Sequence, residues 1–143
     1  MSVERLTLDA NLTHLETKVL DQGFDTTGSG LFHKNEQLIR RPTTSWNLGA
    51  AFHDARGNVD LRVIHVGERA DRDFRPFPAA PVVDTAYTRV DVSGALPLGQ
   101  FAPKAAGAEL TLRLENLFDK KYQSVFNFLT PRRTALVGAR VTF

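Results

Sequence analysis

The stretch that decides the fold is NLFDKKYQSVFNFLTPRRTALVGARVTF, residues 116–143. From residue 134 onward it alternates without a break between two faces. One face carries only apolar side chains and the other mostly small or polar ones: Ala135, Val137, Ala139, Val141 and Phe143 against Leu136, Gly138, Arg140 and Thr142. Because successive side chains of a strand point to opposite sides, this pattern predicts a strand with one apolar face. An apolar aromatic at the end of the series needs a reason, since chain ends usually fray in water.

Five earlier stretches repeat this alternation, and we expect strands there. They cover about residues 4–17, 45–53, 59–65, 89–96 and 108–115, each with Leu, Val, Ala, Trp or Phe on one face. A short connection containing Gly57 separates the second and third strands, which is a hairpin signature. The pattern contains no clear helix. The sequence therefore predicts an all-β fold, an antiparallel meander of about six strands.

The connections between these strands alternate in length: long, short, long, medium and long. In a meander this places three long loops at one end of the sheet, an asymmetry typical of transmembrane β-barrels. A soluble sandwich shows the same alternation along its strands. A soluble all-β binding module therefore remains an alternative, as does a small outer-membrane barrel that closes by oligomerising. Because single-chain barrels need about eight strands, the membrane interpretation makes this chain a piece of a larger barrel.

Composition excludes several classes. The chain has 143 residues and a net charge of +2, from 18 basic and 16 acidic residues, so charge does not point to nucleic acid. It has no cysteine, which excludes disulfides and thiolate metal sites. No apolar run approaches the roughly 20 residues of a membrane helix. The start, MSVERLTLDANL, does not have the pattern of a signal peptide. We expect either a cytoplasmic protein or a true start further upstream.

Two motifs in the opening stretch resemble the C-terminus of TonB-dependent outer-membrane receptors. They are NLFDKKY (residues 116–122) and PRR (residues 131–133), followed by the strand that ends in Phe143. The motif residues are Asn116, Leu117, Phe118, Asp119, Tyr122, Pro131 and Arg133. Weaker similarities upstream are RRP, VGERADRDF and YTRVDVSGAL, so the resemblance covers essentially the whole chain and is closest to cobalamin and siderophore receptors. The chain departs from the family pattern at Arg132, where family members often have Gly.

The resemblance implies a 22-stranded barrel with an N-terminal plug domain. Residues 1–143 would be its C-terminal segment, with the plug and about sixteen earlier strands absent. Such receptors are active transporters, not enzymes, and import ferric siderophores, haem or cobalamin across the outer membrane of Gram-negative bacteria. We expect this segment alone not to transport. The implied partners are outer-membrane lipid, the outer-membrane assembly machinery and, for the complete receptor, the TonB energy-coupling protein; no cofactor is implied. Ala139, Val141 and Phe143 match the assembly signal.

Candidate ligand contacts are the long-loop residues Arg40, Arg41, Arg72 and Phe126. The pair Arg40 and Arg41 suits lipopolysaccharide phosphates or an anionic ligand, although an exposed charge pair is the simpler interpretation. Aromatic residues that suit either interfacial girdles or ordinary packing are Trp46, Tyr122, Phe126 and Phe128.

Other chemistry is not indicated. The histidines His14, His33, His53 and His65 lack metal-ligand spacing, and we predict no metal site. We find no Ser/His/Asp pattern and predict no catalytic residues. The Gly-rich DTTGSG lacks the Lys and the helix of a phosphate-binding loop.

Overall fold

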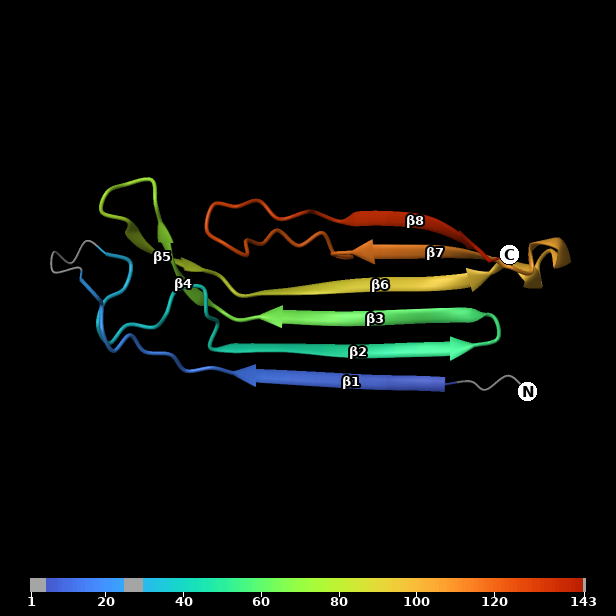
Figure 1. Ribbon diagram of the computed structural model, residues 1–143, viewed down its shortest axis with the longest axis horizontal. Coiled ribbons are helices and arrows are strands. Elements are labelled where there is room, and N and C mark those ends of the chain that lie inside the picture. The colour runs from blue at the N-terminus through green and yellow to red at the C-terminus, as the bar shows by residue number, and fades with distance from the viewer. Residues whose placement is uncertain (1–4, 25–29, 143) are drawn as a thin grey trace.

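The structure is a computed structural model that describes residues 5–24 and 30–142 (Figure 1). Six strands pair in chain order into one antiparallel sheet: β1 (Arg5–His14), β2 (Thr44–Asp54), β3 (Gly57–Val66), β6 (Tyr87–Pro97), β7 (Ala108–Glu115) and β8 (Thr134–Val141). Two short 3-10 helices, Leu98–Gln100 and Pro103–Ala105, connect β6 to β7. No helix in the described ranges is long and apolar enough to cross a membrane. The predicted all-β class and six-stranded antiparallel sheet are confirmed.

The connections divide sharply between the two ends of the sheet. Figure 1 shows the three long ones, residues 15–43, 67–86 and 116–133, together at one end. The other end carries the tight turn between β2 and β3 and the helical connection between β6 and β7. This is the arrangement that the alternating connection lengths predicted. We call the first end the loop end and the second the turn end.

One pair of strands was missed in the sequence. Residues 67–86 were expected to form a loop, but they contain the hairpin of β4 (Arg69–Asp73) and β5 (Ala80–Asp84), which pair with each other. The hairpin gives no apolar alternation because its buried positions are charged. Arg69, Asp71 and Asp84 are each at most 4% exposed. Charge and not hydrophobicity marks this strand, because four of the five residues of β4 are charged.

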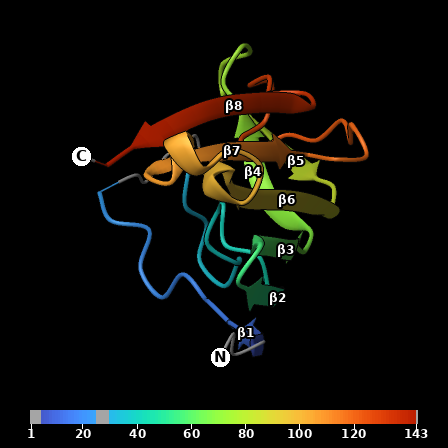
Figure 2. The same ribbon diagram turned by 90° about the vertical axis from the view of Figure 1, so that its right-hand side faces the viewer.

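The register aligns the apolar faces of all six strands. Leu8 pairs with Ala50 and Ala50 with Leu61, and the row continues across the sheet through Val92, Leu114 and Ala135. The rows beside it are equally apolar. Seen from the turn end in Figure 2, the six strands of the sheet follow one another as a single layer in the order β1, β2, β3, β6, β7 and β8. The result is one continuous apolar face, which we call the outer face.

The outer face is bare. Leu8 is 71% exposed and Val137 is 72% exposed. Val19 is the one hydrophobic residue that is buried among those the structure describes. A folded domain in water normally gains most of its stability by burying such side chains. This sheet therefore lacks a hydrophobic core of its own.

The opposite face, the inner face, carries paired charges along the strands. Arg89 contacts Asp91 at 2.8 Å, and Arg113 contacts Glu115 at 2.7 Å. Longer contacts join Arg62 to Asp9 at 3.7 Å and Arg140 to Glu109 at 3.8 Å. The solvent-exposed pairs among these, such as Arg62 with Asp9, contribute at most about 1 kcal/mol each. They make the inner face compatible with water without holding the sheet together.

We expect Gly57→Ala to destabilise the sheet by about 1–3 kcal/mol. Gly57 has a φ of 142°, and an added Cβ would lie 2.1 Å from the backbone oxygen of Ala95. Equilibrium denaturation followed by circular dichroism measures the change. The control is Gly138→Ala, whose Cβ would meet only the rotatable Thr111 hydroxyl, at 2.8 Å. Equal effects of the two substitutions would contradict the backbone clash.

Candidate functional site

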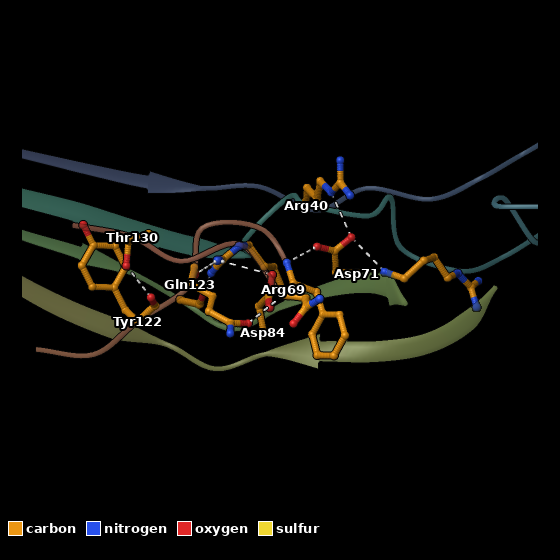
Figure 3. A network of polar contacts seen from close by, with 11 residues as sticks. Arg40, Arg69, Asp71, Asp84, Tyr122, Gln123 and Thr130 are labelled. Carbon is orange, nitrogen blue, oxygen red and sulfur yellow. Dashed lines mark hydrogen bonds and ion pairs between the residues drawn. The ribbon is translucent and has the colours of Figure 1, made fainter. Parts of the chain in front are cut away.

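The three long connections meet at the buried carboxylate of Asp71 in β4 (Figure 3). Its Oδ1 accepts hydrogen bonds from Nε of Arg40, at 2.9 Å, and from the amide of Arg72, at 2.8 Å. Its Oδ2 accepts one from the amide of Phe126, at 2.8 Å. Asp71 is only 1% exposed. One side chain therefore joins residues 15–43, the β4–β5 hairpin and residues 116–133.

The environment of Asp71 favours its charged form. Burial by itself raises the pKa of this carboxyl, but the amides of Phe126 and Arg72 and the guanidinium of Arg40 lower it by more. The net pKa lies below its ordinary value. Hydrogen bonds to a carboxylate stabilise the ionised form in this way. Asp71 is therefore an anion at neutral pH, and its three donors are matched to that charge.

Arg69 forms a second joint between the same segments. Its Nη2 donates to the backbone oxygen of Gln123 and lies 3.5 Å from Oδ2 of Asp84. Its guanidinium also lies over the ring of Tyr87, 5.8 Å from the centroid. The pKa of Asp84 is raised by its burial, lowered by the positive charge of Arg69 and raised again by the negative charge of Asp71. The net pKa of Asp84 is above its ordinary value. Arg69 thus ties β5 and the last loop to the start of β6.

Arg72 completes the connection to the first loop. Its Nη2 lies 2.9 Å from Oε2 of Glu36 and 3.5 Å from the backbone oxygen of Leu31. The amide of Arg40 donates to the backbone oxygen of Ala70 at 2.7 Å. Three long loops are therefore cross-linked by charged groups rather than by an apolar core.

The structure brings three of the four candidate ligand contacts together around Asp71. Arg40 binds the carboxylate and stacks over Phe74 at 5.8 Å, and Arg72 is 6% exposed. Phe126 offers its amide to Asp71 and its ring to the guanidinium of Arg75, at 5.7 Å. Arg41 is exposed. Sequence reasoning missed Asp71, Asp84 and Arg69, although the charge alternation of RADRD was visible.

Asn116 ends β7 and turns the chain into the last loop. It has a φ of 53°, a left-handed conformation that Asn tolerates better than most residues. Its side chain closes the turn by binding the backbone of Lys120. Nδ2 of Asn116 donates to the backbone oxygen of Lys120 at 2.9 Å, and Oδ1 of Asn116 accepts from the amide of Lys120 at 2.8 Å. Its own amide donates to Oδ1 of Asp91 at 2.9 Å. Asn116 is 2% exposed, so these bonds replace water.

Asp119 closes the base of the same loop. Its Oδ1 accepts hydrogen bonds from Nε of Arg132, at 2.7 Å, and from the amide of Arg133, at 3.0 Å. A second bond joins Nη2 of Arg132 to Oδ2. The Arg132 side chain and the Arg133 amide lower the pKa of Asp119 to about 2. Arg132, the departure from the family pattern, is thus the principal partner of a motif residue.

The remaining motif residues are divided between the interior of the loop and its surface. Tyr122 stacks on Tyr87 at 4.1 Å and accepts a hydrogen bond from Arg89 at 3.3 Å, so it packs on the inner face. The backbone oxygen of Pro131 accepts from Asn116 at 3.4 Å. The other two, Leu117 and Phe118, are half-buried and exposed, respectively.

The other aromatic and apolar candidates lie away from the Asp71 network. Trp46 stacks on His65 at 5.1 Å on the outer face, and Phe128 is exposed. Ala139 and Val141 lie on the outer face of β8. Phe143 lies outside the described residues. In the chain as described, no three His, Asp or Glu side chains gather to hold a metal ion.

Comparison with known proteins adds no relative. No family model matches the chain, and no curated protein matches it. The structure itself defines an all-β protein, with a six-stranded antiparallel sheet that has a bare apolar face and with a charge-linked cluster of loops at one end.

We expect Asp71→Asn to loosen the loop end. The substitution replaces an acceptor oxygen by an amide and removes the charge that Arg40 faces, at a cost of about 2–3 kcal/mol. Hydrogen exchange at the Phe126 amide should then accelerate about 30- to 100-fold.

The control for this experiment is Asp54→Asn. Asp54 lies at the turn end, where its Oδ1 accepts a hydrogen bond from the Arg56 amide at 2.8 Å, so the Phe126 amide should exchange at nearly the wild-type rate. Equal acceleration in the two variants would remove Asp71 from its linking role.

The stabilising interaction of the Asp119 carboxylate with Arg132 and the Arg133 amide should be lost in acid. Because its pKa falls on folding, its stabilising charge is present above the ordinary value of 3.8 and is lost as the pH falls through about 2. Carbon-13 NMR of the carboxyl gives this pKa directly. Arg132→Ala should raise it towards 3.8. Arg133→Ala keeps the backbone amide and should change it far less, and a larger effect of Arg133→Ala would refute the assignment.

Proposed function

We propose that this chain forms part of the wall of an outer-membrane β-barrel. In this proposal it is the C-terminal segment of a TonB-dependent active transporter for a scarce ligand such as a ferric siderophore, haem or cobalamin. The observation that carries the proposal is the bare outer face, apolar on all six strands, in a chain whose described residues include a single buried hydrophobic one. Each fully buried Leu or Val gains about 1.5–3 kcal/mol over an exposed one. A lipid environment supplies that gain to a single-layered sheet.

The slant of the apolar band supports a barrel. On β1 the last apolar residue of the outer face before the loop end is Leu12. The row of paired residues that begins at Leu12 crosses β2 and β3 and reaches β6 at Thr88. On β8 the corresponding apolar residue nearest the loop end is Ala135. The row of paired residues that begins at Ala135 crosses β7 and reaches β6 at Val92. Counted along β6, from Thr88 to Val92, the edge of the apolar band therefore shifts four residues towards the turn end between β1 and β8, which is about 13 Å. Over five strand spacings of about 4.8 Å this gives a slant of about 30°, close to the strand tilt of transmembrane barrels.

The open edges of the sheet support a larger assembly. β1 and β8 each pair with a neighbour on one side only. Lipid cannot satisfy the backbone groups of a free edge, so a membrane-spanning sheet must close. In the proposed receptor the neighbours are earlier strands of the same barrel. Copies of this chain are the second candidate, and cross-linking in detergent separates the two because only copies give ladders of multiples of 15.9 kDa.

The loop end supports a receptor. Its three loops are held together by buried charges around Asp71, and the inner face beneath them is polar. The motif residues Asn116 and Asp119 shape the last loop, which connects the resemblance to a physical role. Ordered loops at one end of a polar-lined wall are suited to ligand capture.

A matched pair of cysteine variants tests the membrane orientation. The chain has no native cysteine. Ala50→Cys places a label on the outer face beside Leu8, and Ala51→Cys places one on the inner face beside Thr7. An NBD label at position 50 in vesicles should emit at shorter wavelength and be quenched strongly by brominated acyl chains.

The label at position 51 should be quenched much less, because the inner face is polar. Equal quenching at the two positions, or none at either, would refute the lipid-facing assignment. A chain that stays monomeric in water without detergent, with its outer face covered, would favour the soluble binding module instead.

A further inference from the structure

A cavity of about 590 Å³ lies at the loop end, between the end of β5 and residues 116–133. Its volume falls within the usual range for small-ligand sites, roughly 300–1,000 Å³. Val83, Phe126 and Leu129 provide apolar wall. The polar uncharged part of the lining includes Gln123, Tyr122 and Thr130; the hydroxyl groups of Tyr122 and Thr130 are already bonded to Arg89 and to the Tyr122 backbone oxygen, respectively. The cavity therefore combines an apolar lining with a few polar groups, as ligand pockets commonly do.

The charged residues on the wall differ in whether their charge is paired. The side chain of Asp84 is 2% exposed and is paired with Arg69 at 3.5 Å. The guanidinium of Arg132 is held by Asp119. The third charged residue on the wall is Lys121, and its ammonium has no hydrogen-bond or ion-pair partner among the residues that the structure describes. The uncompensated charge of the cavity is positive.

Part of the wall is held by contacts within the chain, while Lys121 and Leu129 extend into solvent, with Leu129 96% exposed. Tyr122 is stacked on Tyr87 at 4.1 Å, and its backbone oxygen accepts a hydrogen bond from the Thr130 hydroxyl. The Phe126 amide is bound by Asp71 at 2.8 Å. Groups held in this way lose little conformational freedom on binding, which favours affinity.

We propose that this cavity binds a small ligand with an aromatic or apolar body and one anionic group. The body packs on Phe126, Leu129 and Val83, and the anion pairs with the ammonium of Lys121. The inference deepens the proposed function and rests on it, because the loop end meets an external ligand only if the sheet spans the membrane. An anion is favoured over a cation because Asp84 is buried and already paired with Arg69.

The test uses fluorine NMR with the full chain in lipid nanodiscs, and signals from empty nanodiscs are subtracted. The probe is 4-fluorobenzoate, and 4-fluorobenzyl alcohol is its uncharged counterpart. Lys121→Ala and Phe126→Ala should each raise the Kd for 4-fluorobenzoate about fivefold. The alcohol should bind more weakly than the benzoate to the wild type, and Lys121→Ala should not change its Kd.

Neighbouring residues serve as matched controls. Lys120 and Phe128 share the loop but do not line the cavity, so Lys120→Ala and Phe128→Ala should leave the Kd within twofold. Absence of saturable benzoate binding to the wild type overturns the proposal, and so does equal binding of the alcohol. Equal losses in Lys120→Ala and Lys121→Ala also overturn it. None of these outcomes alters the brominated-lipid result, so failure of this inference is distinct from failure of the membrane assignment.

Discussion

The pairing register of the six strands is the constraint on which the rest of the structure depends. Side chains alternate across a strand, so a slip of one residue would move every side chain of that strand to the opposite face. The observed register places Leu8, Leu61 and Leu114 in one row and keeps Asp9, Arg62 and Arg113 on the other side. The main features of the sheet follow from this separation. They are the bare apolar outer face, the polar inner face and the need for an apolar environment that covers the outer face.

The loop end is organised by a different principle. Its buried positions hold charges in place of apolar side chains, and Asp71 satisfies donors from three connections that are far apart in the chain. Buried charge is costly to leave unpaired, so such a cluster is stable only when every partner is present. This requirement makes the loops depend on one another. It also holds parts of the β4–β5 hairpin and of the last loop in place beside the cavity that Lys121 lines.

These two regions together motivate the functional proposal. A sheet with no core of its own needs an apolar environment on one side, and in the proposed membrane setting its open edges need neighbouring strands. The charged loop end and the polar inner face need water. The proposed receptor wall in an outer membrane would meet all of these conditions, and the slant of the apolar band is close to the strand tilt of such barrels.

The amino-acid sequence alone determined the all-β class, the six strands of the sheet and the placement of three long loops at one end, because a period of two and the spacing of turns are local signals. It also marked Asn116, Asp119 and Tyr122, through a motif. Only the tertiary structure decided that β4 and β5 form a hairpin, that Asp71 links three loops, and that Arg132 holds Asp119. The contact between Arg132 and Asp119 joins residues 13 positions apart, and that between Asp71 and Phe126 joins residues 55 positions apart. No local pattern specifies such partners, because ion pairs are chosen by where the folded backbone brings the charges.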